Sequence, residues 1–152
     1  GTQIGGALKN IYAIAAGIAE GLNLGENAKS ALISRSFAEM TRYAKKFKAD
    51  KNTLFGLSGL GDLILTCSSK NSRNTQFGIK LASSKYDNFL DLLKSQEVTE
   101  GYYTVKAVYN ISQKKNIDMP IMESVYNILY KQHDLKEELS NLLSRPITEE
   151  KI

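Results

Sequence analysis

Residues 4–22 read IGGALKNIYAIAAGIAEGL. Apolar residues recur in this stretch at spacings of three and four, which places them on one side of an α-helix. These residues are Ile4, Leu8, Ile11, Ala15, Ile18 and Leu22. Gly25 and Asn27 interrupt the pattern soon afterwards. The stretch therefore predicts one long helix with an apolar face.

The same helical spacing returns in a second segment. Its apolar members are Ala31, Leu32, Phe37, Met40, Ala44 and Phe47. Four cations close the segment, where positive charge suits the carboxyl end of a helix dipole. They are Lys45, Lys46, Lys48 and Lys51. We interpret this cluster as a solvated helix end rather than as a binding patch.

Later stretches complete the fold prediction. Helical patterns appear around 89–93, from about 102 to 115, at 121–129 and at 135–143, and Pro146 stops the last one. Strand-like alternation is weak everywhere. We therefore predict the fold class as all-α, with residues 1–152 forming a single multi-helix domain. Residues 57–74, rich in Gly, Ser and Asn, are expected to form turns and short elements, where sites tend to lie.

Composition excludes several function classes. The net charge of +4 and the pI near 9.1 are mildly basic, but no nucleic-acid motif accompanies them, so no nucleic-acid partner is expected. Cys67 and His133 are the only residues of their kinds, too few for a disulfide or a usual zinc site. Residues 11–19 are too short an apolar run to span a membrane. We expect a cytoplasmic protein with no membrane partner and no metal.

Lys9 is the one cation inside the first predicted helix, with Gly5 and Gly6 before it and Ala13 and Ala16 after it. A helical side chain leans back over the preceding turn, so Lys9 is expected to lie across the two glycines. The pattern fits a small-residue face for close packing, with the lysine reaching solvent, or a site cleared around an ammonium group. The neighbouring Asn10 adds a polar group that a core helix does not need.

Residues 59–66, GLGDLILT, form a second candidate. If a helix follows Gly61, Asp62 and Thr66 share a face because they are four positions apart. Asp62 is also favoured at a helix start, so a purely structural role remains open.

Residues 71–74, NSRN, precede a further predicted helix. Ser72 and Asn74 are good N-cap residues, and a helix N-terminus offers free N–H groups to a phosphate. Arg73 adds a planar fork that binds phosphate through two bonds. Capping with a solvated arginine is the alternative. Residues 97–101, EVTEG, are interpreted on their own as acidic capping of a helix.

The order of these motifs resembles the NAD(P)-dependent glycerol-3-phosphate dehydrogenase family. The motifs are GGALKN at 5–10, GLGDL at 59–63, SRN at 72–74 and VTEG at 98–101. The resemblance continues through AVY at 107–109, MPI at 119–121 and SRP at 144–146, and so covers nearly the whole chain. In this family a dinucleotide-binding domain comes first and an all-helical, substrate-binding domain second. The chain looks like the second domain, since it lacks a glycine-rich fingerprint directly after a strand.

The resemblance implies a reaction, cofactors and partners. The reaction is reversible reduction of dihydroxyacetone phosphate by NADH or NADPH to glycerol 3-phosphate, as used in glycerophospholipid biosynthesis. NAD or NADP is expected to bind mainly to the missing nucleotide-binding domain, so this domain alone is expected to be inactive. The implied partners are a small phosphorylated substrate and a second copy of the chain, in a homodimer.

The resemblance also implies residue roles. Lys9 is the general acid/base, because an ammonium can stabilise and protonate the oxygen on which a hydride leaves negative charge. Asp62 orients Lys9 or binds a substrate hydroxyl. The implied substrate-binding residues are Lys9, Asp62, Ser72, Arg73 and Asn74. The implied cofactor-binding residues are Arg73, Val98 and Glu100, and Asn10 and Thr66 are weaker candidates.

Two other functions remain open. One is the helical domain of another two-domain hydroxy-acid dehydrogenase, which would lack the SRN phosphate motif at 72–74. The other is a non-catalytic helical interaction module. Such a module would not need Lys9, Asp62 and Arg73 to converge in space.

Overall fold

The computed structural model describes residues 2–47, 61–69, 71–83 and 100–145, with side chains described from residue 6 onward. These residues form seven helices and no strand, which confirms the predicted all-α fold class. The helices are α1 (Thr2–Gly21), α2 (Glu26–Lys46), α4 (Asp62–Ser68), α5 (Arg73–Ala82), α7 (Glu100–Lys115), α8 (Pro120–Lys131) and α9 (Leu135–Leu143). The helical pattern at 89–93 lies outside the described residues.

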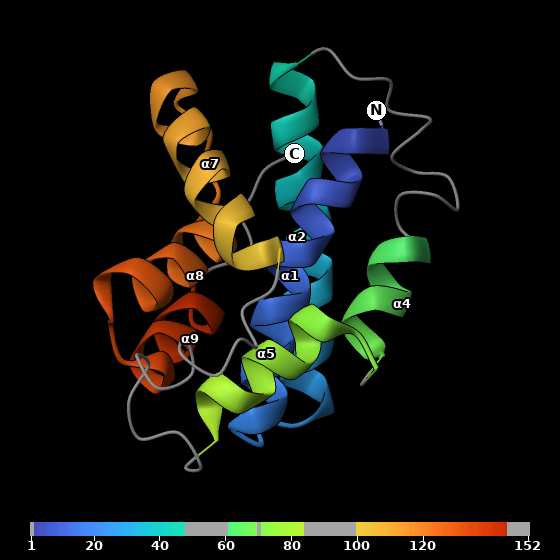
Figure 1. The fold of residues 1–152 in the computed structure, drawn as a ribbon, viewed down its shortest axis with the longest axis vertical. Coiled ribbons are helices and arrows are strands. Elements are labelled where there is room, and N and C mark those ends of the chain that lie inside the picture. The colour runs from blue at the N-terminus through green and yellow to red at the C-terminus, as the bar shows by residue number, and fades with distance from the viewer. Residues whose placement is uncertain (1, 48–60, 70, 84–99, 146–152) are drawn as a thin grey trace.

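Helix α1 is the centre of the fold. It contacts α2, α4, α5, α7 and α8, whereas α9 packs against α8 and α2 (Figure 1). Every residue from 11 to 19 is buried, so α1 is enclosed rather than amphipathic over this stretch. The predicted apolar face is therefore only part of its buried surface. The rest of the buried surface consists largely of alanines and glycines. Because these residues differ little in hydrophobicity from their neighbours, the sequence pattern did not reveal that they are buried.

Helices α1 and α5 cross in direct backbone contact. A Cβ atom on Gly17 would collide with the carbonyl oxygen of Thr75, and one on Gly78 would collide with the carbonyl oxygen of Ile14. Farther along α1, a Cβ on Gly21 would lie 2.7 Å from the Cβ of Ala82. The absence of side chains at these glycines lets α5 lie directly on α1. This crossing fixes where α5 begins.

Two buried ionisable side chains on α2 hold α8 and α9 in place. The carboxyl group of Glu39 accepts the backbone N–H groups of Ile121 and Met122 at 2.7 and 3.0 Å, in the first turn of α8. One turn earlier, Arg35 donates to the carbonyl oxygens of Leu142 at 3.2 Å and Arg145 at 2.7 Å, at the end of α9. A buried carboxyl group thus accepts N–H groups at one helix N-terminus, and a buried arginine donates to carbonyl groups at the C-terminal end of another helix.

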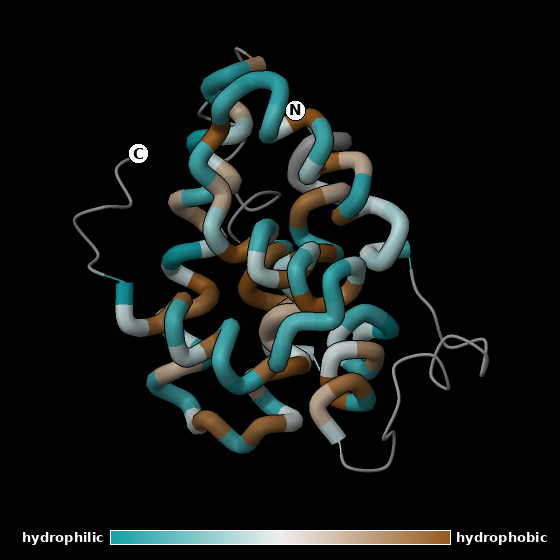
Figure 2. The backbone as a smooth tube through the Cα atoms, turned by 90° about the vertical axis from the view of Figure 1, so that its left-hand side faces the viewer, coloured by the Kyte–Doolittle hydropathy of each residue, from teal (hydrophilic) through white to brown (hydrophobic). Residues whose placement is uncertain are grey.

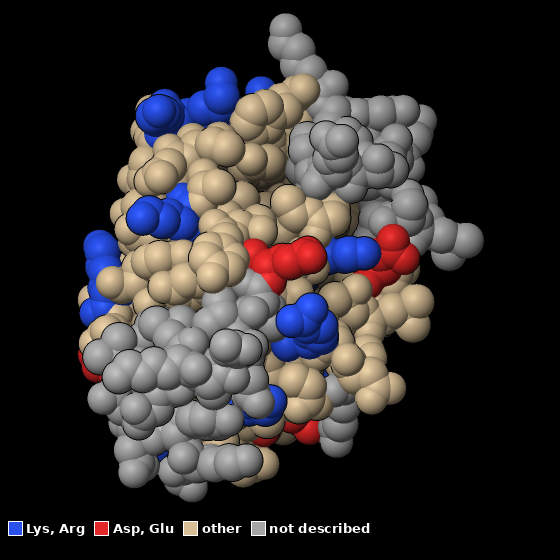
Figure 3. Space-filling model, in the orientation of Figure 1, with Lys and Arg blue, Asp and Glu red and all other residues tan. Residues whose placement is uncertain are grey.

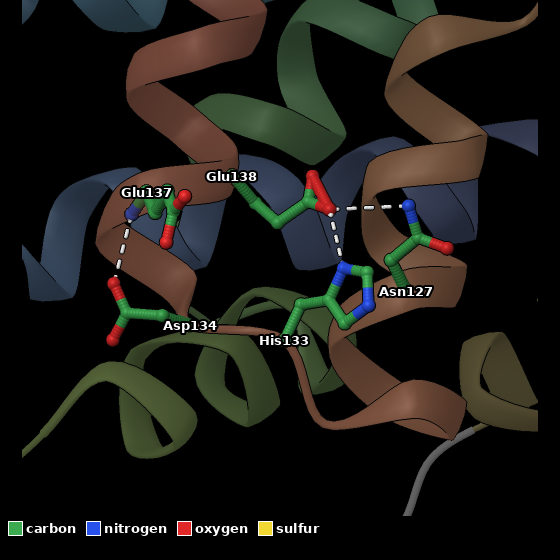
Figure 4. A network of polar contacts seen from close by, with 5 residues as sticks. All are labelled: Asn127, His133, Asp134, Glu137 and Glu138. Atoms are coloured by element: carbon green, nitrogen blue, oxygen red, sulfur yellow. Dashed lines mark hydrogen bonds and ion pairs between the residues drawn. The ribbon is translucent and has the colours of Figure 1, made fainter.

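Polar contacts build the corner between α8 and α9 (Figure 4). Glu138 accepts a hydrogen bond from the Nδ2 atom of Asn127 at 3.1 Å and lies 3.0 Å from Nδ1 of His133. Asp134 caps α9 by accepting the N–H of Glu137 at 2.9 Å. The single histidine therefore lies in a helix–helix connection.

The carboxyl end of α2 differs from the prediction at one residue. Phe47 was expected among the apolar members of the helix, but it follows α2 and is 39% exposed. Its ring contacts the Tyr43 ring at a centroid distance of 4.9 Å and lies 5.4 Å from Nζ of Lys115. Lys45 and Lys46 are exposed, as a solvated helix end requires, whereas Lys48 and Lys51 lie outside the described residues.

Figure 2 shows hydrophobic and hydrophilic stretches alternating along the helices. Among the described helices, none combines the length and apolar character needed to cross a membrane.

Candidate active site

Three of the candidate residues begin helices that pack against α1. Asp62, Arg73 and Glu100 are the first residues of α4, α5 and α7, and all three helices contact α1. Figure 3 shows acidic and basic side chains close together near the middle of one face, where Figure 1 places these first turns. Helix starts from distant parts of the chain thus share one surface.

Lys9 lies on α1 and is half-buried. A Cβ atom on Gly6, one turn earlier, would meet no described atom within 4 Å. Close helix packing therefore does not explain Gly6, in contrast to Gly17. Ala13 and Ala16 are buried, so the small-residue face does pack farther along the helix. As far as the described residues go, there is room beside Lys9 at Gly6.

Helix α4 begins directly after Gly61, so Asp62 and Thr66 lie one turn apart on one helix. Asp62 is exposed and Thr66 is half-buried. Gly61 is the N-cap residue, and no side chain caps α4. The carbonyl oxygen of Thr66 accepts a hydrogen bond from Oγ1 of Thr75 at 3.2 Å, which links α4 to the first turn of α5.

The start of α5 has the features of an anion site. Ser72 is the N-cap, as predicted, and its Oγ accepts the N–H of Thr75 at 3.4 Å. The backbone N–H groups in the first turn of a helix lack helical acceptors, and the dipole there favours negative charge. Arg73 is exposed at this position and adds its guanidinium.

Of the two good N-cap residues at the start of α5, Ser72 is the cap and Asn74 is not. It is the second residue of the helix and is only 9% exposed. Its Oδ1 accepts the backbone N–H of Gly101 at 3.1 Å. The side chain therefore satisfies a donor on another helix, since Ser72 already occupies the capping position.

The start of α7 completes this arrangement. Glu100 is exposed, and as an acid in the first turn it also suits the helix dipole. Gly101 is buried, and a Cβ atom there would lie 3.1 Å from the carbonyl oxygen of Asn10. Asn10 therefore meets α7 through its backbone. Val98 lies outside the described residues.

In the structure, Asn10 and Asn74 both lie against Gly101. Within the described part of the chain, Lys9, Asp62 and Arg73 make no ion pair with one another. The convergence of those three side chains on one ligand stays a prediction. Sequence reasoning missed the linking role of Thr75, and it quoted Gly101 only as part of a motif.

The family model and the sequence relatives that match this chain all point to one family. The family model described as "NAD-dependent glycerol-3-phosphate dehydrogenase C-terminus" matches residues 1–140. Glycerol-3-phosphate dehydrogenase [NAD(P)+] from Colwellia psychrerythraea is 46% identical over 145 residues, covering 95% of this chain and 43% of that protein. The protein of the same name from Brachyspira hyodysenteriae is 48% identical over 147 residues, covering 95% and 44%.

Solved structures agree with the sequence relatives. A crystal structure of glycerol-3-phosphate dehydrogenase from Coxiella burnetii matches with a TM-score of 0.88 and 39% identity, covering 95% of this chain and 44% of that one. The Saccharomyces cerevisiae enzyme matches with a TM-score of 0.78 and 28% identity, covering 92% and 41%. The chain therefore spans less than half the length of these relatives.

Proposed function

Because the chain belongs to the family of NAD-dependent glycerol-3-phosphate dehydrogenase C-terminal domains, we propose that it forms the substrate side of such an enzyme. The proposed reaction interconverts dihydroxyacetone phosphate and glycerol 3-phosphate. A nucleotide-binding part, within the remaining length of the relatives, would complete the site. The observation that carries the proposal is that Asp62, Arg73 and Glu100 begin three helices that all contact α1, the helix that carries Lys9.

The start of α5 is the proposed phosphate site. Its N–H groups and the exposed Arg73 offer donors to three phosphate oxygens. Ser72 has its Oγ engaged by the N–H of Thr75, so its hydroxyl hydrogen is the group that remains for a ligand. Asn74 has its Oδ1 engaged by Gly101, which leaves its NH₂ group. All these groups are donors, and a phosphate is an acceptor.

Lys9 is the proposed general acid. Reduction places negative charge on the C2 oxygen of the substrate, and an ammonium both stabilises that charge and supplies the proton. Among the described residues, none lies within 4 Å of a Cβ atom placed on Gly6, and this room would let a ligand approach the lysine. In the oxidising direction the same side chain would accept the proton of the substrate hydroxyl.

The described residues on the proposed cofactor side fit a dinucleotide. Arg73 is an exposed cation that suits a phosphate, and Glu100 is an exposed carboxylate that can accept hydrogen bonds from ribose hydroxyls. NADH or NADPH, when bound, supplies the hydride. Val98 is proposed to lie on the same side.

We also propose that the enzyme acts in the cytoplasm as a homodimer and serves glycerophospholipid biosynthesis. The family resemblance supports each of these statements. Exposed apolar side chains on α4 and α7 support the dimer: Ile64 is 42% exposed, Leu65 69% and Tyr103 66%.

The deciding experiment measures reduction of dihydroxyacetone phosphate by a protein that joins this chain to a nucleotide-binding part. Lys9→Ala is expected to lower kcat by roughly 10²–10⁴-fold, as for loss of a general acid, with a smaller change in KM. Lys106→Ala, at an exposed position of α7, is the control and should leave kcat unchanged. Near-normal turnover in Lys9→Ala would refute the assignment.

A further inference from the structure

Gly101 touches two helices that carry proposed site residues. We propose that Gly101 is a positioning residue of the substrate site, which orients the Asn74 amide and sets the starts of α5 and α7 against α1. This inference rests on the proposed function. It concerns a residue that lies beside the site and acts through Asn74, not one that touches the substrate.

The first support is a buried hydrogen bond between two helix starts. Gly101 is the second residue of α7, so its N–H has no acceptor within the helix. It donates instead to Oδ1 of Asn74 at 3.1 Å, and both residues are buried. A buried donor left unpaired is costly, so this bond holds α7 to α5.

The bond also determines which way the Asn74 amide faces. A carboxamide has one oxygen and one NH₂ group, and the oxygen is bound to Gly101. The NH₂ group is then the donor that remains for a ligand, next to Arg73 at the start of α5. An amide turned the other way would offer an oxygen to a phosphate, which is repulsive. Gly101 thus selects the useful orientation.

The second support is steric. A Cβ atom at position 101 would lie 2.6 Å from Cδ1 of Ile14, 2.7 Å from Oδ1 of Asn74 and 3.1 Å from the carbonyl oxygen of Asn10. The Ile14 methyl group is the flexible end of a side chain and can move. The Asn74 oxygen cannot move without breaking its bond to Gly101. Alanine at this position therefore disturbs the atom that orients the amide.

Gly21 supplies a matched comparison. A Cβ there would also be too close to its neighbours, at 2.7 Å from Cβ of Ala82 and 2.9 Å from the carbonyl oxygen of Ile79. Gly21 ends α1, twelve positions after Lys9 and so roughly 18 Å along the helix. Alanine overpacks its surroundings at both Gly21 and Gly101, but only at Gly101 does it disturb Asn74. Comparing the two variants therefore separates the effect of overpacking from the effect on Asn74.

The experiment compares Gly101→Ala, Gly21→Ala and the double variant Ile14→Val/Gly101→Ala in the active enzyme. Gly101→Ala is expected to raise KM for dihydroxyacetone phosphate about tenfold, the loss of one hydrogen bond to a charged group, with kcat within a few-fold. Gly21→Ala should lower the melting temperature with KM unchanged. The double variant lacks Cδ1 of Ile14, which removes one of the steric clashes. Its melting temperature should therefore be higher than that of Gly101→Ala, while its KM stays as high.

A normal KM in a well-folded double variant would overturn the proposal, as would an equal rise of KM in Gly21→Ala. A second readout needs no activity. In the ¹⁵N-labelled chain, the Asn74 side-chain amide should shift in Gly101→Ala and stay in place in Gly21→Ala, and an unshifted amide in Gly101→Ala would also overturn the proposal. An inactive parent enzyme would refute the proposed function, while the amide spectrum would still decide whether Gly101 holds Asn74.

Discussion

At the scale of single residues, Arg73 combines exposure with a position at the start of α5. Arg73→Ala should raise KM for dihydroxyacetone phosphate by roughly 10–100-fold, since a charged hydrogen bond contributes about 1.5–3 kcal/mol. The phosphate is bound in ground and transition states alike, so kcat should change less. Steady-state kinetics at saturating cofactor measures both quantities.

Arg73→Lys provides the finer comparison. A lysine keeps the charge but loses the fork that makes two parallel bonds, so KM should lie between those of the parent and Arg73→Ala. Lys131→Ala, at the exposed end of α8, should leave KM unchanged. If kcat fell a thousandfold with KM unaltered, Arg73 would have to stabilise the transition state rather than bind the phosphate.

Residue roles that follow local rules were predictable, and those that depend on distant partners were not. Ser72 caps α5 because a serine before a helix accepts an N–H three positions later. The partner of Asn74 is 27 positions away, so no local rule identifies it. The burial of Glu39 was missed for the same reason, since its partners lie in α8.

At the scale of helices, Glu39 ties α2 to α8 in a way that depends on pH. Burial away from water is the largest influence on its carboxyl and raises the pKa from 4.5 to about 8, although the N–H groups of Ile121 and Met122 and the charge of Arg42 oppose the rise. The Tyr12 hydroxyl lies beside this carboxyl and also opposes the rise.

The sign of the pH effect follows from this raised pKa. The unfolded chain releases the Glu39 proton near pH 4.5 and the folded chain only near pH 8, so stability from this group is complete below the lower value. It is lost as pH rises toward the upper value, by a few kcal/mol in order of magnitude. Urea unfolding between these pH values should therefore show falling stability.

Glu39→Gln should flatten that pH dependence, because an amide does not titrate. It should also lower stability below pH 4.5 by about 1–3 kcal/mol, since an amide can accept only one of the two N–H groups well. Glu123→Gln, an exposed carboxyl in the first turn of α8, is the matched control and should keep the slope of the parent. An unchanged slope in Glu39→Gln would assign the pH dependence to other groups.

The positions of most helices could be predicted from the sequence. What surrounds each helix in the folded domain could not. The predicted segments at 102–115, 121–129 and 135–143 correspond to α7, α8 and α9, because each has strong apolar spacing and a stop signal. The central position of α1 was not predicted, because a helix surrounded on all sides differs from a half-buried one mainly in small residues. The contact between Gly17 and Gly78 involves two helices and leaves no periodic signal.

At the scale of the whole molecule, exposed apolar side chains predict self-association. Leu65, at 69% exposure, is the most exposed of the large hydrophobic residues described, and Ile64 lies beside it on α4. We expect a dimer mass by light scattering at micromolar concentration, and a monomer mass for Leu65→Asp. Tyr103→Ser, on α7, tests whether that side chain belongs to the same contact. A monomeric parent would contradict the prediction.

The enclosure of α1 also determines how fast its backbone amide hydrogens exchange with solvent. Its amide hydrogens from 11 to 19 are buried and its backbone lies against α5, so no local opening exposes them to water. In deuterated solvent we expect these hydrogens to be replaced last, at a rate set by global unfolding. The short α4 should exchange earlier, since Ile64 and Leu65 face water. We therefore expect Lys9 to lie next to the slowest-exchanging segment, and Asp62 to lie on a helix that opens and closes many times before the domain unfolds.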